Sequence, residues 1–280
     1  MSPTVAIIAA GAMGSAVAAR LSENGVTVVT SLAGRSDASA KRAREAGMKD
    51  ADDREIAEAD FLLSIVPPGE GLALAQRLTP VLQAANRKPV FVDCNAVSPG
   101  TVEQIAKVVA AAGTPFVDAG IIGPPPKPGT NNTKFYASGA HAGDFAKLNA
   151  YGLIVRVLTG PPTAASALKM SYAGMTKGFT ALGAAMMLAA VRGGTADALK
   201  TELAESQPAL LAFLARSVPG MYAKAYRWVA ELDEIGTFVG SRYPEHEMLA
   251  AAARLYERMA DDFDGRKTEI AELDKFLDSR

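Results

Sequence analysis

Two glycines near the N-terminus have a spacing that could serve ligand chemistry. Gly11 and Gly14 follow a short apolar run and open an Ala-rich segment, a pattern that predicts a strand, a tight turn and a helix. Such a turn directs free backbone N–H groups towards an anion, for example a dinucleotide pyrophosphate. Ala9 replaces the first glycine of G-x-G-x-x-G, which is tolerated if its φ stays negative. The first candidate cofactor-binding residues are Gly11, Ala12, Met13 and Gly14.

The loop after the second predicted strand, Thr27–Ser31, indicates which dinucleotide fits. Sites for NAD place Asp or Glu at the end of this strand to bind the ribose 2′-OH, and none stands here. Arg35 offers a planar guanidinium for a 2′-phosphate, while Ser31 and Ser36 add hydroxyls. The alternative is a solvated surface arginine. We therefore expect NADP(H) in preference to NAD and assign Ser31, Arg35 and Ser36 to its binding.

Two further strand ends could contribute to the same ligand. The run Phe61–Val66 is followed by two prolines, which keep the chain extended where cofactors lie on a parallel sheet. The run Pro89–Asp93 is followed by polar residues, of which Asn95 is placed to meet the nicotinamide side. The candidates from these two ends are Val66, Pro67, Pro68 and Asn95.

The elements that must position these residues follow from hydrophobic periodicity. Over the first ~160 residues, short β-rich runs, among them Pro115–Asp118, alternate with helical patterns, which implies parallel strands joined by right-handed crossovers. After Gly160 the pattern is helical throughout, beginning with a long segment over Thr163–Val191. The predicted fold class is an α/β Rossmann domain, a mostly parallel doubly wound sheet, followed by an all-α C-terminal domain. The predicted domains are residues 1–160 and 161–280.

Composition narrows the classes of function. The 29 basic and 30 acidic residues give a net charge of −1, which does not favour binding to nucleic acid or to a membrane surface. One cysteine and two histidines are too few for a disulfide or a multi-histidine metal site, so no metal is expected. The longest apolar tract, Phe179–Val191, is shorter than the ~18–20 residues that span a bilayer. We expect a cytoplasmic protein.

Several motifs together resemble those of a known superfamily: Gly11–Gly14, Val66–Pro68, Asp93–Pro99, Asp118–Pro124, the helix containing Lys169, and Lys224–Leu232. The chain is similar to β-hydroxyacid dehydrogenases and 6-phosphogluconate dehydrogenase-like proteins, which include 3-hydroxyisobutyrate dehydrogenases and imine reductases, and most similar to a branch with a phosphogluconate dehydrogenase-like C-terminal helical domain. The resemblance implies a Rossmann domain, a long interdomain helix and a homodimer formed through the C-terminal helical domain, with the active site between domains.

The resemblance also implies a catalytic residue. In the superfamily a lysine early in the interdomain helix acts as general acid/base, and Lys169 stands at that position. It would protonate a carbonyl oxygen as hydride arrives from NADPH, and reverse this step in oxidation. The alternative is a helix-surface lysine. Lys177, about two turns later, is a weaker competitor for the role.

Two departures from the superfamily concern the substrate. Ala173 stands where an asparagine often contacts substrate, and the neighbouring Tyr172 offers a hydroxyl instead. A Pro-rich apolar segment containing Ile121, Ile122 and Gly123 replaces a Ser-Gly-Gly carboxylate-binding loop. Because such a segment offers few free N–H donors, we expect a substrate bulkier or less acidic than a small hydroxyacid.

A helical stripe late in the chain has two interpretations. Lys224 and Arg227 lie on one face with Glu231 and Glu234, and Trp228 lies beside them. The stripe contacts substrate or cofactor, or it forms ion pairs within its own helix. The leading hypothesis is an NADP-dependent oxidoreductase that interconverts a carbonyl and an alcohol. The alternatives are imine reduction, which the presence of Lys169 disfavours, and NADP binding without turnover.

Overall fold

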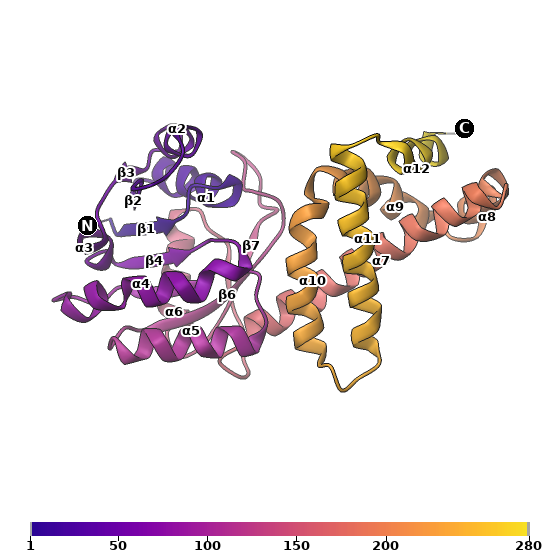
Figure 1. Cartoon of the computed structure of the whole chain (residues 1–280). Helices are drawn as coiled ribbons and strands as arrows, with labels where there is room; N and C mark the ends of the chain where they lie inside the picture. Colours follow the sequence, from indigo (N-terminus) through magenta and orange to yellow (C-terminus); the bar gives the residue numbers. More distant parts are fainter. Residues whose placement is uncertain (1, 279–280) are drawn as a thin grey trace. The chain divides into compact units, whose positions relative to one another are not determined.

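The computed structural model describes residues 2–278 and contains two compact units. The first ends at Met170 and the second begins at Ser171, so the boundary falls inside the long helix α7 (Ala164–Arg192). This helix was expected over Thr163–Val191, with the domain boundary at residue 160. Each unit is described by itself below (Figure 1).

The first unit is built on one eight-stranded sheet in the order β3-β2-β1-β4-β5-β6-β7-β8. Every neighbouring pair is parallel except β6 and β7, which are antiparallel. The chain goes from β1 to β2 on one side and later to β4 on the other, so the strand order reverses beside β1. Ligands of such sheets bind at this reversal, beyond the carboxyl ends of the strands. The strands are β1 (Thr4–Ile8), β2 (Thr27–Thr30), β3 (Lys49–Asp50), β4 (Phe61–Ser64), β5 (Val90–Asp93), β6 (Phe116–Ile122), β7 (Lys134–Ser138) and β8 (Val155–Val157).

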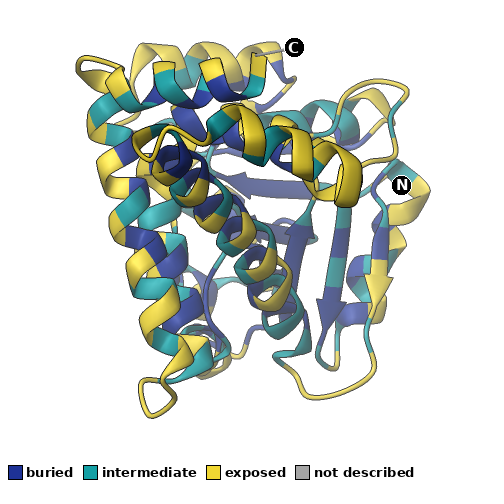
Figure 2. Ribbon diagram, turned by 90° about the vertical axis from the view of Figure 1, so that its right-hand side faces the viewer, coloured by how far each residue is buried: buried dark blue, intermediate teal, exposed yellow. Residues whose placement is uncertain are grey.

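Helices cover both faces of this sheet because the central strands are apolar on both faces. Along β1, Val5 and Ile7 belong to one core cluster, whereas Ala6 and Ile8 belong to another. Figure 2 shows the resulting dark-blue strands of the sheet. The helices of this unit are α1 (Ala12–Glu23), α2 (Asp37–Glu45), α3 (Asp53–Ala57), α4 (Gly71–Ala84), α5 (Pro99–Ala111) and α6 (Ala142–Phe145), with 3-10 turns at Pro68–Glu70 and Ala146–Tyr151.

Over residues 171–278 the second unit is helical throughout. Glycines on α7 let neighbouring helices approach closely: a Cβ on Gly183 would lie 2.2 Å from a methyl group of Leu214, and one on Gly174 would lie 3.1 Å from a methyl group of Ile235. The predicted change along the chain, from an alternating α/β region to an all-helical region, is confirmed. After α7 the helices are α8 (Ala196–Ser206), α9 (Pro208–Met221), α10 (Ala225–Val239), α11 (Glu245–Asp264) and α12 (Thr268–Asp278), with a 3-10 turn at Tyr222–Lys224.

Two parts of the sheet differ from expectation. The strand expected at Pro115–Asp118 continues to Ile122, because β7 pairs with it antiparallel through Ile122↔Lys134. Ile121 and Ile122 are therefore strand residues and not loop residues. The short strand β3 and the helix α3 were not expected, since both are brief and polar.

By length and composition, α7 could cross a membrane, although the tract noted in the sequence was shorter. One such helix is weak evidence, because core helices of soluble proteins pass the same test. The Rossmann-like sheet from which the helix extends favours the soluble interpretation.

Candidate functional site

The turn between β1 and α1 fits a bound pyrophosphate. A Cβ on Gly14 would lie 2.0 Å from the carbonyl oxygen of Ala9, so only glycine permits this close packing of helix on strand. A Cβ on Gly11 would meet nothing within 4 Å, and Gly11 is the N-cap of α1, which Ala12 and Met13 continue. The φ of Ala9 is not positive, so the condition for replacing the first glycine is met. Space and free N–H groups at a helix N-terminus are what a pyrophosphate requires.

A cavity of about 350 Å³ lies beside the end of β2. Of the residues expected to bind the nucleotide, Ser31, Arg35 and Val66 line this cavity. The Ser36 hydroxyl accepts a hydrogen bond from the Ser39 N–H at 3.3 Å and caps α2, and its predicted contact with the cofactor stays a prediction. Arg77 of α4 also lines the cavity, and the sequence analysis did not identify it.

Asn95 is nearly fully buried and is bound within the protein. Its Oδ1 accepts from the Val66 N–H at 2.8 Å, and its Nδ2 donates to Ser64 Oγ at 2.8 Å and to Asp93 Oδ1. Asn95 therefore fixes the chain just before Pro67 and Pro68, and its predicted contact with the nicotinamide stays a prediction. Burial, together with the negative charge of nearby Asp118, raises the pKa of Asp93 to about 7.

Asp118 joins β6 to the start of α7 through hydrogen bonds. Its carboxylate accepts from the Ser166 N–H at 2.8 Å, from the Ser166 hydroxyl at 2.5 Å and from the Ser138 hydroxyl at 3.1 Å. Ser138 Oγ in turn accepts from the Ala165 N–H at 3.0 Å. Burial raises the pKa of Asp118, and the Ser166 and Ser138 hydrogen bonds oppose that rise. A carboxylate at a helix N-terminus also interacts favourably with the helix dipole, so this cluster anchors α7.

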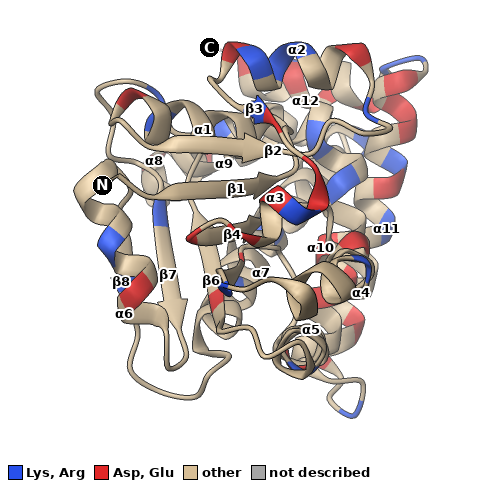
Figure 3. Cartoon of the chain, turned by 90° about the vertical axis from the view of Figure 1, so that its left-hand side faces the viewer, with Lys and Arg blue, Asp and Glu red and all other residues tan. Residues whose placement is uncertain are grey.

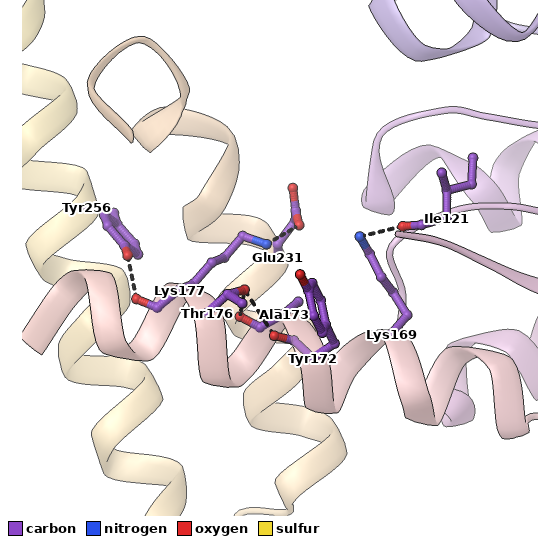
Figure 4. A network of polar contacts seen from close by, with 8 residues as sticks. All are labelled: Ile121, Lys169, Tyr172, Ala173, Thr176, Lys177, Glu231 and Tyr256. Atoms are coloured by element: carbon purple, nitrogen blue, oxygen red, sulfur yellow. Dashed lines mark hydrogen bonds and ion pairs between the residues drawn. The ribbon is translucent and has the colours of Figure 1, made fainter. Parts of the chain in front are cut away.

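The anchored first turns of α7 bring Lys169 against β6. Lys169 Nζ donates to the carbonyl oxygen of Ile121 at 2.8 Å (Figure 4). A Cβ on Gly120 would lie 2.9 Å from the Ala165 carbonyl oxygen and 3.0 Å from Lys169 Cβ, so glycine allows this approach. The side chain of Ile121 is buried in the core, and what it offers here is its backbone carbonyl.

Lys169 lies at the sheet edge that carries the cofactor turn. Ser64, Asp93 and Asp118 are aligned across β4, β5 and β6, and Ile121 lies three residues further towards the carboxyl end. Beyond Ile122, Gly123 has φ +124°, and a Cβ there would lie 2.1 Å from the Asn132 carbonyl oxygen.

Lys177, the weaker competitor, forms an internal ion pair in the second unit. Its Nζ lies 2.7 Å from Glu231 Oε2 (Figure 4). The same Nζ lies 5.3 Å from the ring centroid of Trp228. Trp228 also packs edge-on against Tyr256, whose hydroxyl donates to the Lys177 carbonyl oxygen at 2.5 Å. Glu231 of the helical stripe thus forms an ion pair with a lysine of another helix, α7. Tyr172, Lys224 and Arg227 are exposed, and their predicted contact with substrate stays a prediction.

Two known family models match the chain, one in each unit. Residues 4–150 match the family model described as the NAD binding domain of 6-phosphogluconate dehydrogenase. Residues 190–259 match a domain of unknown function, DUF1932. No curated protein matches the chain.

Solved structures are similar along almost the whole chain. A conserved protein of unknown function, described as structurally similar to 3-hydroxyacid dehydrogenases, is 30% identical, with 93% of this chain and 98% of that chain covered and a TM-score of 0.72. A Mycobacterium tuberculosis 3-hydroxyisobutyrate dehydrogenase with L-serine is 19% identical, covering 94% and 95%, with a TM-score of 0.70. An imine reductase from Myxococcus stipitatus with NADP⁺ is 19% identical, covering 98% and 100%, with a TM-score of 0.56.

Proposed function

The chain belongs to the family with the NAD-binding domain of 6-phosphogluconate dehydrogenase and has a hydroxyacid dehydrogenase-like fold, and from that premise we propose an NADP-dependent oxidoreductase. It interconverts a carbonyl and an alcohol, with Lys169 as the general acid/base. The observation that carries the proposal is the hydrogen bond from Lys169 Nζ to the Ile121 carbonyl, at the same sheet edge as the Gly11 turn.

Each of the chain's own groups would have one role in the proposed reaction. NADPH, when bound, supplies a hydride to the carbonyl carbon. Lys169 donates a proton from Nζ to the carbonyl oxygen, and takes it back in the oxidation. The Ile121 carbonyl orients Nζ, and Asp118 holds the helix that carries it. The Gly11 N–H groups and the α1 N-terminus bind the pyrophosphate.

The preference for NADP rests on Arg35. It lines the cavity next to Ser31, and no acidic residue ends β2 to bind a ribose 2′-OH. Arg35→Ala should weaken NADPH binding about tenfold and leave NADH binding nearly unchanged, since a charge-assisted hydrogen bond contributes about 1.5–3 kcal/mol. Titration calorimetry with both cofactors measures this. Equal effects on both would contradict the assignment.

Turnover itself is tested with a substrate panel. The purified chain with NADPH is offered aldehydes, 2-oxo and 3-oxo acids, bulkier apolar ketones and cyclic imines, and oxidation of the cofactor is followed. Reduction of ketones that Lys169→Ala abolishes supports the proposal. Reduction of imines alone favours the second candidate, imine reduction, to which the fold likeness to an imine reductase points. Tight NADPH binding with no turnover favours a binding or sensing protein. The buried Ala173, which stands in place of an asparagine, supports that alternative.

The exposed face of α7 supports a homodimer. Five large apolar side chains there are separated by three and four residues in alternation, as in a helix–helix seam, and each is 49–62% exposed. We propose that a second copy covers them, because a seam of this spacing matches an identical helix. Leu182→Asp should then yield monomers by light scattering, with Leu210→Asp on α9 as control; a monomeric wild type would contradict this. The five are Tyr172, Met175, Phe179, Leu182 and Met186.

A cytoplasmic location belongs to the same proposal. The dehydrogenase fold of the first unit and the use of a soluble cofactor support it. Fractionation of cells that express the chain tests it, and recovery in the membrane fraction would contradict it.

A further inference from the structure

A second arginine, from another part of the chain, lines the cavity beside β2. Arg35 enters it from the loop after β2, whereas Arg77 enters it from the middle of α4, more than 40 residues later in the chain. Glu70, Ala73 and Leu74 also line the cavity. The charged residues that line the cavity are therefore two arginines and one glutamate. The lining therefore has one more positive than negative side chain, which favours an anionic group in the cavity.

An ion pair fixes where the Arg77 guanidinium lies. Arg77 Nη1 lies 2.5 Å from Asp53 Oδ2, at the first residue of α3. The Arg77 side chain is 47% exposed, so it is only partly desolvated by this contact. A guanidinium has five N–H donors, and the contact with Asp53 uses one of its nitrogens. The pair holds Arg77 at the cavity and leaves donors for a ligand.

The segment that holds Arg77 also holds the loop that carries Arg35. Asp50 Oδ1 accepts a hydrogen bond from the Leu32 N–H at 2.9 Å. A second cavity, of about 570 Å³, extends along this acidic segment and shares Ser31, Ala33 and Arg77 with the first. In Figure 3 the chain from β3 into α3 is coloured red over these acidic residues. The short elements that sequence analysis missed thus position both arginines.

We propose that Arg77 is a specificity-determining residue that binds the 2′-phosphate of NADP(H) together with Arg35. The inference rests on the proposed function and deepens it. A ribose 2′-phosphate is dianionic near neutral pH, and two guanidinium groups can each give it charge-assisted hydrogen bonds. A nucleotide that lacks this phosphate gains nothing from Arg77. Arg77 therefore contributes to the choice between NADP and NAD and not to affinity for adenosine in general.

The test uses calorimetry with two adenosine nucleotides that differ only in the 2′-phosphate. Arg77→Ala should weaken adenosine 2′,5′-bisphosphate about tenfold and change adenosine 5′-monophosphate less than about twofold, because only the first has the group that Arg77 binds. Arg77→Lys should retain part of the affinity, since it keeps the charge and loses the fork. NADPH and NADH should show the same contrast.

Arg87→Ala is the matched control. Arg87 is also a surface arginine paired with an aspartate, Asp60, but it lines a different cavity. It should leave both nucleotides unchanged, and a loss equal to that of Arg77→Ala would overturn the inference by showing a general charge effect. The inference would also be overturned if Arg77→Ala bound both nucleotides with wild-type affinity, or if it weakened the binding of both by the same factor. If the wild type binds neither NADPH nor NADH, the proposed function fails too; if it binds NADPH and Arg77→Ala does not alter the preference, this inference alone fails.

Discussion

The two halves of α7 each contain a lysine, Lys169 and Lys177, and the two ammonium groups have different polar partners. In the first unit, Lys169 donates to a neutral backbone carbonyl, that of Ile121. In the second unit, Lys177 is 8% exposed and its ammonium lies against the Glu231 carboxylate and the Trp228 ring. Residues of one type, two turns apart on one helix, thus have different surroundings.

The difference separates a chemical role from a structural one. An ammonium paired with a carboxylate in a mostly buried place stabilises the packing and has its charge compensated there. In the proposed mechanism, the Lys169 ammonium is oriented by a neutral carbonyl oxygen at the sheet edge of the Gly11 turn, where its proton can serve a substrate. The comparison favours Lys169 over Lys177 as the proposed acid/base, and variants of the two lysines can test it.

The largest expected effect is on turnover. Lys169→Ala should lower kcat about 10²–10⁴-fold with the carbonyl substrate that the panel identifies, because general acid catalysis contributes that much. NADPH affinity and the melting temperature should stay close to wild type. If Lys177→Met abolishes turnover and Lys169→Ala does not, the assignment of the two lysines is reversed.

Next in size is the loss of the internal ion pair. Lys177→Met leaves the Glu231 carboxylate without its partner and should destabilise the protein by about 3 kcal/mol, the low end for a buried pair because Glu231 is partly exposed. Urea unfolding measures it. The double variant Lys177→Met/Glu231→Leu should recover part of the loss, since no charge is then stranded; a double variant as unstable as the single would contradict the ion-pair account.

A smaller effect is expected at the anchor of α7. Ser166→Ala removes the hydroxyl that donates to Asp118 but keeps the backbone N–H, so it should destabilise by about 1.5 kcal/mol, as for a hydrogen bond to a charged group. Ser206→Ala in α8, whose hydroxyl donates to the Glu202 carbonyl oxygen on the surface, is the control and should change stability by under about 0.5 kcal/mol. Equal losses in the two variants would show that Asp118 is not a special anchor.

The smallest effect concerns pH. Asp93 keeps its proton up to about pH 7 in the folded protein but loses it near its usual value of 3.8 when unfolded. The folded state therefore binds more protons between these values, and the stability that Asp93 contributes is full below pH ~4 and is lost as pH rises through 7.

Asp93→Asn removes that dependence. It should raise the melting temperature more at pH 8 than at pH 5, because only at pH 8 does it replace a buried, ionised carboxylate. Calorimetric scans at the two pH values measure it. The same shift at both values would show that Asp93 titrates normally.

Local patterns predicted most of the fold. The alternation of β and helical periodicity, the Gly11–Gly14 turn and the start of α7 near residue 163 follow from near-neighbour preferences, and the structure places them within one or two residues. The place of Arg35 at the cavity could be predicted because it lies in the short loop after β2. The length of β6 could not, because Gly120–Ile122 become a strand only by pairing with β7.

Contacts between distant segments carry what was missed. Arg77 lies in an ordinary helical pattern, and only the fold brings it to the β2 loop. Glu231 was considered with neighbours on its own helix, but its partner is 54 residues away. Asp118 was known only as part of a motif, because its partners Ser138 and Ser166 come from β7 and α7. Spacing along the chain does not encode such pairings.

The packing of Trp228 has a spectroscopic consequence. It is the one tryptophan in the chain, and it lies in the second unit against Tyr256 and the Lys177 ammonium. Its fluorescence therefore reports unfolding of the helical unit, whereas far-ultraviolet circular dichroism reports both units. Coincident curves from the two probes would mean a single cooperative transition, and separate curves would give each unit its own stability. The protein thus contains an intrinsic reporter for the half of α7 that holds Lys177.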